Sequence, residues 1–462
     1  MRKRAEKPPG ETAGFKTLAA ALRAGRLPLA AYIDRLEARC GEREPALGAL
    51  LPEPGRFDRL RREARALLVR YPRPASRPPL FGVAVAVKDV FRVEDWPTRA
   101  GSQLPAELFT GPEADCVTRL KQAGALVLGK TVSTEFAYFA PGATRNPHHL
   151  EHTPGGSSSG SAAAVGAGLC PLALGTQTIG STIRPAAYCG VVGFKPSYGR
   201  ISAAGLIPLA PSLDHVGVLA AEVAVAEAAA ALLCRDWRAP ALLRRRRPRL
   251  GVPEGPYLAH ASAGGLASFR ATCERLAAAG FAVEPVAALP DFDEIVARNI
   301  LVVAAEAAAV HAPWFGRYRE LYHPRSAELI ERGQQVGRAA LVRALAGREE
   351  LRRELETLMD AHRLDAWLSP SAPGPAPHGL ESTGDPVMNV PWTHAGLPAL
   401  GLPSAMSPEG LPLGLQVVGR YGGDEALLAA GRVLERTLRP APGSAAPGAG
   451  APTPASAQSP PR

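Results

Sequence analysis

Short apolar segments of strand character alternate with longer helix-forming segments along most of this chain, and this alternation limits the fold more than any other feature. The segment "RPPLFGVAVAVKDV" ends in an alternating, β-branched run that is typical of a strand. "CVTRLKQAGALVLGKT" has the pattern of a helix, a stop at Gly124 and a strand. Residues 171–176 predict a short buried strand, and residues 398–418 predict two more around the turn "SPEG". The alternation predicts an α/β fold.

Length and composition set the domain organisation. The chain has 462 residues, of which 46% are hydrophobic and 21% charged, so it can bury a large core. From about residue 221 the sequence is mostly helix-forming, with one strand near "PRLGVP". Helical periodicity marks residues 15–25, 29–40 and 57–70. We expect a flexible N-terminus over residues 1–14, a folded domain over 15–438 and a low-complexity, disordered tail over 439–462.

The charge balance is basic but does not indicate a nucleic-acid partner. The formal net charge is +10, yet only seven of the 53 basic residues are lysine. An arginine bias together with abundant alanine, glycine and proline is typical of a genome-composition effect. The densest basic run, "RRRRPR" at residues 244–249, precedes a short apolar segment and predicts a solvated connector. We therefore expect no nucleic-acid binding.

Targeting signals and cysteine spacing bear on location. The N-terminal "MRKRAEKPPGETAG" has charge but no apolar stretch, so it is not a signal peptide. No run approaches 18 apolar residues, and no membrane partner is expected. The six cysteines show no metal-ligand spacing, and most have apolar neighbours. These features predict a cytoplasmic protein with reduced thiols.

Lys88 is the first candidate for chemistry, at the end of an apolar strand. A lysine at such a place usually reaches solvent. Lysine is rare in this chain, however, and arginine would serve any surface role. Only lysine can give up its proton, and an apolar setting lowers its pKa toward the range that a general base needs.

A glycine- and serine-rich run, "PGGSSSGSAAAV", contains the second candidate, Ser157. Such runs are often flexible linkers, but this one opens a helix in mid-chain, so its backbone N–H groups could line a polar pocket. The part "GSSSG" also fits a G-x-S-x-G nucleophile turn. That turn should follow an apolar strand, whereas "HLEHTP" precedes this one.

The stretch "GTQTIGSTIRPAAYCG" contains the third candidate, Ser181, as a nucleophile without a histidine nearby in the sequence. If the turn is tight, the backbone N–H groups of residues 178–181 point inward together, as an oxyanion hole requires. These residues are Thr178, Ile179, Gly180 and Ser181. His215, in "SLDHVG", could pair with an aspartate but fits a buried turn better. The residues alone indicate a serine hydrolase.

Together these stretches resemble the amidase signature family. Residues 155–202 follow its central signature nearly without gaps, and "FGVAVAVKD" matches its lysine segment. "DCVTRLKQAGALVLGKTVSTEFA" and "NVPWTHAGLPALGLPSAMSPEGLPLGLQVVGR" match two further segments. The resemblance covers roughly residues 15–437 and is weakest over 220–380. It implies a large mixed β-sheet core covered by helices on both faces.

The resemblance also implies a Ser–cisSer–Lys triad in this chain. Ser181 would be the nucleophile, Ser157 the bridging serine after a cis peptide, and Lys88 the base, with no metal and no cofactor. The proton of Ser181 would leave through the Ser157 hydroxyl to a neutral Lys88. The implied activity is amide hydrolysis through an acyl-enzyme, on a linear amide rather than a peptide bond.

Departures from the commonest family pattern, G-T-D-T-G-G-S-I-R, leave roles open. Gln177 replaces the aspartate, Ile179 replaces a glycine, and Arg184 comes one position later. A variant reading G-T-Q-T-x-G-S-x-I-R-P fits this chain better. The roles of Gln177 and Arg184 are not readable from the sequence.

Alternatives remain at the level of function and partner. One is the glutamine-hydrolysing A subunit of a tRNA-dependent amidotransferase; its stretch near "N-M-D-E-F-A-M-G-S-S" differs from "VSTEFAYFAPGA" at residues 132–143. Another is a catalytically silent binding protein on the same fold. A small-molecule amide is the expected partner. A homodimer is compatible with this reading, but no sequence signal sets the oligomeric state. Phe136, Tyr138 and Phe139 are candidates for an aromatic wall of the substrate pocket.

Overall fold

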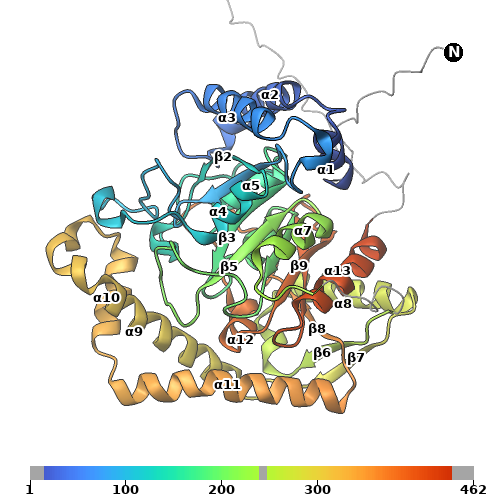
Figure 1. The fold of residues 1–462 in the computed structure, drawn as a ribbon. Coiled ribbons are helices and arrows are strands. Elements are labelled where there is room, and N and C mark those ends of the chain that lie inside the picture. The colour runs from blue at the N-terminus through green and yellow to red at the C-terminus, as the bar shows by residue number, and fades with distance from the viewer. Residues whose placement is uncertain (1–14, 239–246, 440–462) are drawn as a thin grey trace, which may run out of the picture.

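The computed structural model of the chain describes residues 15–238 and 247–439 (Figure 1). Residues 1–14 and 440–462, for which the sequence predicts a flexible N-terminus and a low-complexity tail, lie outside the described residues, as do residues 244–246 of the basic run. The described strands are β1 (Ala84–Lys88), β2 (Leu126–Thr131), β3 (Leu172–Gln177), β4 (Val192–Lys195), β5 (His215–Ala220), β6 (Leu250–Glu254), β7 (Val283–Ala287), β8 (Ala366–Pro370), β9 (Ala399–Met406) and β10 (Pro412–Val418). The described α-helices are α1 (Phe15–Ala24), α2 (Leu29–Leu47), α3 (Arg56–Arg70), α4 (Asp115–Gln122), α5 (Ser159–Gly166), α6 (Ile183–Tyr188), α7 (Val223–Leu233), α8 (Ala263–Ala278), α9 (Phe292–Tyr318), α10 (Pro324–Gln334), α11 (Arg338–Ala361), α12 (Val390–His394) and α13 (Asp424–Leu438).

The strands form one mixed sheet of ten strands in the order β2-β1-β3-β5-β4-β9-β10-β8-β6-β7. The three strands at one edge, β2, β1 and β3, are parallel, and so are β8, β6 and β7 at the other edge. The strands between these groups pair antiparallel. Parallel edges need helical crossovers, which explains why helices separate β1 from β2 and β6 from β7. The prediction of an α/β fold with a mixed sheet is confirmed.

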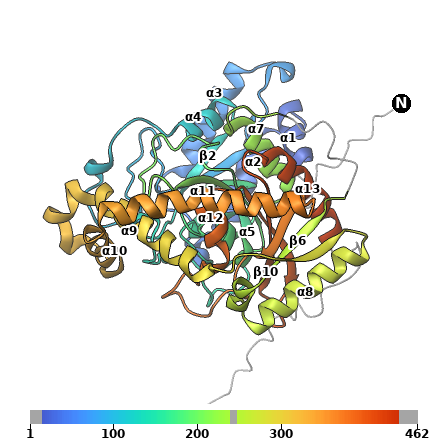
Figure 2. The ribbon, with the colours of Figure 1, turned by 90° about the horizontal axis from the view of Figure 1, so that it is seen from below.

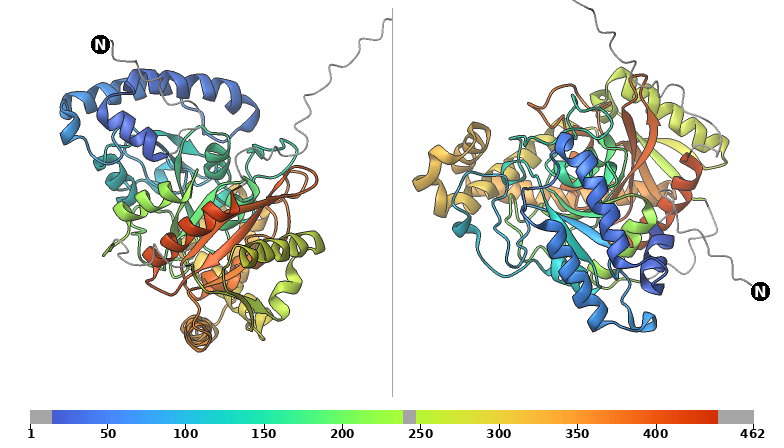
Figure 3. Two further views of the ribbon diagram at one scale, coloured as in Figure 1. Left: turned by 90° about the vertical axis from the view of Figure 1, so that its right-hand side faces the viewer. Right: turned by 90° about the horizontal axis from the view of Figure 1, so that it is seen from above.

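Helices cover both faces of this sheet. A Cβ built at Gly401 of β9 would lie 3.4 Å from Ile183 of α6, whereas the neighbouring Leu400 lies against Gly431 of α13. Successive residues of a strand point to opposite faces, so α6 and α13 lie on different sides. Views from the side and from above show the same layering, with α1–α3 in blue over the β2 end (Figure 3). Most of the sheet is therefore buried on both faces, whereas the edge strand β7 buries only Val286.

The α9–α11 region lies outside these layers. Seen from below, α11 runs across the molecule, and α9 and α10 extend from its end (Figure 2). The segment Phe292–Leu321 is long and apolar enough, by length and composition alone, to span a membrane. Charged residues interrupt it, so it contains no uninterrupted apolar run of 18 residues. It packs against α10, α11 and α12 and buries Asn299 and His311, and 44% of its most apolar window is buried in the protein.

Most of the strands that the sequence predicts are present, and four further strands are not among the predictions. The expected strands at β1, β2, β3, β6, β9 and β10 are all present. The sequence predicts no strand at β4, β5, β7 and β8, although these are about as long as the predicted strands β1, β2, β3 and β6. The prediction that His215 lies in a turn was wrong: it is the first residue of β5 and pairs with Gln177 of β3.

Candidate active site

Lys88 ends β1 and is completely buried. Its Nζ donates hydrogen bonds to Ser157 Oγ at 2.7 Å and to Thr176 Oγ1 at 2.8 Å. No carboxylate in the described part of the chain forms an ion pair with it. Burial holds the pKa of Lys88 well below its usual value of 10.5, while the more distant Asp214 carboxylate acts in the opposite direction. A neutral amine held by two hydroxyl groups can accept a proton from either of them.

Ser157 lies in the loop that precedes α5, with 2% of its surface exposed. The peptide bond between Gly156 and Ser157 is cis, as the family resemblance implies. The Ser157 carbonyl accepts a hydrogen bond from Thr134 N at 3.2 Å. The loop is thereby fixed to the segment that follows β2, and the Ser157 hydroxyl is directed at Lys88.

Residues 178–181 form the turn between β3 and α6. Three of its carbonyl groups accept hydrogen bonds from the surrounding fold: Ile179 O from Thr393 Oγ1 at 2.6 Å, Gly180 O from Arg184 N at 3.0 Å, and Ser181 O from Ser158 N at 3.3 Å. Within residues 15–238 and 247–439, the backbone N–H groups of the turn bind no acceptor. The turn therefore offers four free N–H groups at Ser181, which is 7% exposed. Such a group of donors is suited to bind an oxyanion.

Only glycine fits at position 180, because Asn389 and Pro386 lie too close to its Cα for a side chain. A Cβ there would overlap Asn389 Oδ1 and lie 2.9 Å from Pro386 Cβ. Any side chain would therefore push the turn away from the segment that carries Asn389.

Gln177 and Arg184, whose roles the sequence left open, both hold loops of the site. Gln177 Oε1 accepts hydrogen bonds from the N–H groups of Thr182 at 2.8 Å and Ile183 at 2.9 Å, directly after Ser181. Arg184 is 1% exposed, and its Nη2 donates to Gly156 O at 2.6 Å. Arg184 thus supports the loop of Ser157, and Gln177 supports the loop of Ser181.

A buried carboxyl group adds to this support. Asp214 accepts a hydrogen bond from Thr178 Oγ1 at 2.5 Å and others from Leu209 N and Ala210 N. Burial raises the pKa of Asp214 to about 6, against the lowering effect of these hydrogen bonds. His215 forms no hydrogen bond with Ser181 in the described part of the chain; its Nδ1 lies 2.6 Å from Leu213 O, and burial holds its pKa well below 6.5.

Sequence reasoning missed three contributors: Thr176, Thr393 and Asp214. Thr176 lies at the end of the predicted strand "PLALGT". This strand pairs with the strand of Lys88, and that pairing is the signal that could have identified Thr176. Thr393 also accepts a hydrogen bond from Gln177 Nε2 at 2.9 Å. The two residues are 216 positions apart in the sequence, and no local pattern predicts such a contact. Of the proposed aromatic wall, Phe136 is buried against His311 and Tyr322, whereas Tyr138 and Phe139 are partly exposed.

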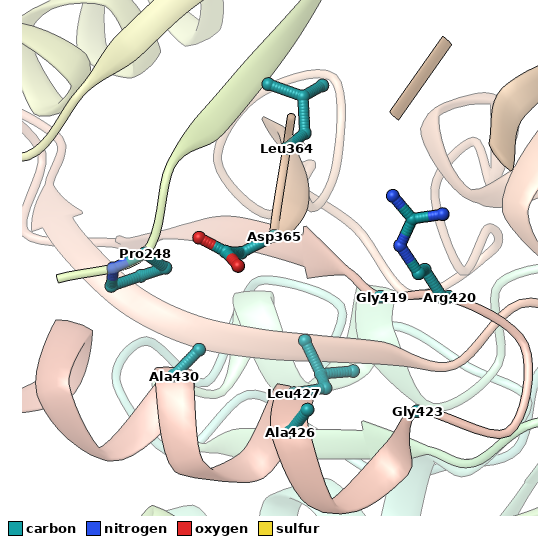
Figure 4. Close-up of a pocket in the computed structure, with 9 residues that line it drawn as sticks. All are labelled: Pro248, Leu364, Asp365, Gly419, Arg420, Gly423, Ala426, Leu427 and Ala430. Atoms are coloured by element: carbon teal, nitrogen blue, oxygen red, sulfur yellow. The ribbon is translucent and has the colours of Figure 1, made fainter. Parts of the chain in front are cut away.

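A pocket of about 150 Å³ lies beside α13, away from the residues described above (Figure 4). It is lined by Pro248, Leu364, Asp365, Gly419, Arg420, Gly423, Ala426, Leu427 and Ala430. None of the sequence-predicted site residues lines it. Its two charged side chains are engaged elsewhere: Asp365 accepts from Arg249 N at 2.7 Å, and Arg420 pairs with Asp360 at 2.8 Å. This pocket is separate from the candidate active site.

Comparison with known proteins agrees with the fold and the signature. The family model "Amidase" matches residues 38–428. The chain is 34% identical to the A subunit of glutamyl-tRNA(Gln) amidotransferase from Anaeromyxobacter sp. (strain K), covering 93% of this chain and 97% of that protein. It is 35% identical to the corresponding protein of Nitratidesulfovibrio vulgaris (strain DP4), covering 89% of this chain and 93% of that protein.

Solved structures give the same result. A crystal structure of an amidase superposes with a TM-score of 0.82 at 32% identity, covering 92% of this chain and all of that one. The native peptide amidase from Stenotrophomonas maltophilia gives 0.78 at 27% identity, covering 94% and 98%. The chain belongs to the amidase signature family. It is thereby placed among enzymes that cleave carbon–nitrogen bonds, either as hydrolases or within amidotransferases.

Proposed function

We propose that this chain hydrolyses a linear amide of a small molecule through an acyl-enzyme on Ser181. One observation carries the proposal: the buried Lys88 amine has no carboxylate partner among the described residues and is hydrogen-bonded to Ser157. The surroundings of Lys88 therefore favour a neutral amine that can take up a proton. The turn over residues 178–181 supports it as well, because its backbone N–H groups can stabilise the negative charge of an oxyanion.

In the first half of the reaction, Ser181 Oγ attacks the amide carbonyl carbon. Its proton passes to Ser157 Oγ while the Ser157 proton passes to Lys88 Nζ, so Lys88 becomes an ammonium ion. The carbonyl oxygen becomes an oxyanion that accepts hydrogen bonds from the N–H groups of residues 178–181. The relay then returns the proton to the leaving nitrogen, the C–N bond breaks, and ammonia or an amine departs.

In the second half, water takes the place of the leaving amine. It gives its proton to the same relay and attacks the acyl carbon. The second oxyanion forms in the same turn. As the bond from the acyl carbon to Ser181 Oγ breaks, the relay returns the proton to Ser181, and the carboxylic acid product leaves and loses its remaining proton to water.

A second candidate is glutamine hydrolysis by the A subunit of an amidotransferase complex. It is favoured by the curated relatives, which include such A subunits that align over nearly the whole chain. The residues 132–143 favour a stand-alone enzyme. Both candidates use the same relay and differ in whether a partner is needed. The free thiols of all six cysteines support the further proposal of a cytoplasmic location.

The relay is tested by intact-protein mass spectrometry after reaction with a fluorophosphonate serine probe. Wild type should gain one adduct, Ser181→Ala none, and Lys88→Ala should react slowly. Ser76→Ala, on an exposed serine, is the matched control and should label like wild type. A folded wild type that stays unlabelled contradicts the proposal, and a labelled Ser181→Ala shows that the nucleophile assignment is wrong.

The two candidates are separated by ammonia release from glutamine, measured on the purified chain and on the chain captured from its own cells. A stand-alone amidase releases ammonia from simple amides without a partner. The A subunit of an amidotransferase co-purifies with its partner proteins, and its glutaminase activity rises when they are present.

A further inference from the structure

The segment that follows β2 contains a strained backbone turn, residues 134–137, directly beside the relay. Phe136 and Ala137 have φ angles of 47° and 60°, which place two consecutive non-glycine residues in the left-handed region. Seven non-glycine residues in the described part of the chain have a positive φ, and these two are the only ones among them that are adjacent. Such a conformation is costly and persists only where its surroundings enforce it, which is common at functional sites.

Side chains of the 134–137 turn anchor it in the surrounding fold. The Phe136 ring is 3% exposed and meets the ring of His311 edge-on, with the two centroids 4.4 Å apart. Its centroid also lies 5.4 Å from that of Tyr322. The buried Glu135 carboxylate accepts a hydrogen bond from the backbone N–H of His323 at 3.0 Å. These contacts offset the cost of the left-handed backbone.

The start of the turn is bonded to the loop of the bridging serine. Thr134 N donates to Ser157 O at 3.2 Å, and a Cβ built on Gly156 would lie 3.2 Å from Thr134 Cγ2. Just before the turn, Val132 O accepts a hydrogen bond from Gly160 N at 3.0 Å. The loop of Ser157 is therefore held from both of its ends by the segment that contains the turn.

The far side of the turn is bonded to the segment of the base. Phe136 N donates to Ala100 O at 2.7 Å, and Ala100 N donates to Asp89 O at 2.9 Å, one residue after Lys88. Ala100 itself has a positive φ of 51°. Two left-handed turns thus connect the backbone beside Lys88 with the backbone of Ser157. Their side chains face each other across 2.7 Å, from Nζ to Oγ.

We propose that the 134–137 turn is a positioning element of the relay, whose left-handed backbone, anchored by the Phe136 ring, sets the place of Ser157 relative to Lys88. Phe136 is thereby a positioning residue and not part of an aromatic wall of the substrate pocket. The inference rests on the proposed function and assigns what keeps its proton relay in register. Reactivity of Ser181 should then depend on the backbone conformation at position 137.

The test changes the backbone preference at position 137 and measures labelling of Ser181 by the fluorophosphonate probe. Glycine adopts a positive φ without strain, whereas a β-branched valine strongly disfavours it. In Ala137→Val we expect the maximal labelling rate, kinact, to fall about tenfold to a hundredfold, the effect of a displacement of about 1 Å. The half-saturating probe concentration, KI, should stay near that of wild type. Ala137→Gly should keep both values.

Arg363→Val is the matched control. Arg363 also has a positive φ, 54°, but it is exposed in the loop after α11. The variant should lose stability in urea denaturation, because it meets the same backbone penalty, and should label like wild type. Phe136→Leu keeps an apolar side chain but loses the ring contacts. It is the milder variant should Ala137→Val not fold, and it should lower kinact in the same direction.

Hydrogen exchange measured by mass spectrometry reports the positioning role without activity. Amides of residues 131–141 and 153–161 should exchange faster in Ala137→Val and in Phe136→Leu than in wild type, and at the wild-type rate in Ala137→Gly and Arg363→Val. Unchanged exchange over 153–161, or wild-type kinact, in a folded Ala137→Val overturns the inference, as does an equal fall of kinact in Arg363→Val. If wild-type Ser181 does not label, the proposed function fails, and exchange decides the positioning role by itself.

Discussion

Two buried lysines at the ends of neighbouring parallel strands differ in the partners that the fold gives them. Lys88 ends β1, and Lys130 is the penultimate residue of β2. Both side chains are at most 2% exposed, and burial lowers the pKa of both. Lys130 Nζ lies 2.6 Å from Asp89 Oδ1 and also binds Thr98 Oγ1 at 2.8 Å. Lys88 binds hydroxyl groups alone.

The register of the two strands produces this difference. Lys130 pairs with Val87, and Lys88 pairs with Thr131. Paired residues of parallel strands share a face and successive residues alternate, so the two lysines leave the sheet on opposite faces. A buried lysine with a carboxylate partner is a structural ion pair. A buried neutral lysine with only hydroxyl partners can act as a base, which is the role we propose for Lys88, so burial alone does not identify a catalytic lysine.

The largest expected effect is on activity, in Lys88→Met. Methionine fills the space without a basic group, and we expect kcat/KM to fall by about 10² to 10⁴, the usual contribution of a positioned base. The free energy of unfolding should stay within about 1 kcal/mol of wild type, because a costly buried amine is lost along with its hydrogen bonds. Steady-state kinetics and urea denaturation measure the two quantities. A large loss of stability would make Lys88 structural, like Lys130.

The converse effect is expected in Lys130→Met. This change leaves Asp89 buried without its partner, and we expect the free energy of unfolding to fall by about 3–5 kcal/mol. The double variant Lys130→Met/Asp89→Asn should regain much of that loss, since no charge stays buried alone. Urea denaturation of the three proteins tests this. A single variant as stable as wild type would show that the ion pair does not matter.

A smaller effect is expected from Gln177→Leu, which removes the acceptor of two N–H groups that follow Ser181. We expect kcat to fall about tenfold to a hundredfold, because a shift of the turn misplaces the nucleophile. Gln177→Glu, which keeps an acceptor oxygen, is the comparison variant and should retain more activity. If leucine and glutamate lower kcat equally, the acceptor role is wrong.

The smallest effect is a shift in pH dependence, in Thr176→Val. Activity needs neutral Lys88, so it should rise with pH through the lowered pKa of that amine. Thr176 Oγ1 accepts a hydrogen bond from Lys88 Nζ and so favours the ammonium form. Its removal lowers the pKa of Lys88 further, and the acid limb of kcat/KM should move to lower pH by about one unit. A limb that moves upward, or one that also moves in Lys130 variants, would contradict the assignment.

Much of the fold and of the relay could be predicted from local sequence. The alternating run before Lys88 and the helix–glycine–strand pattern after Asp115 predicted the parallel strands β1 and β2. The signature predicted that Lys88, Ser157 and Ser181 belong to one site. The strands β4, β5, β7 and β8 were not predicted because strand formation depends on pairing and packing inside the sheet, which a single segment does not encode.

The sequence by itself determined the α/β class, the family and the residues on which the proposed chemistry depends, because each of these features depends on short continuous segments of the chain. Only the tertiary structure decided that Lys130 has a carboxylate partner and that Lys88, among the described residues, has none, since strand register sets the face on which each side chain lies. It also decided that Gln177 and Arg184 support the two serine loops. These contacts join segments up to 216 positions apart, and such contacts form only when packing brings the segments together.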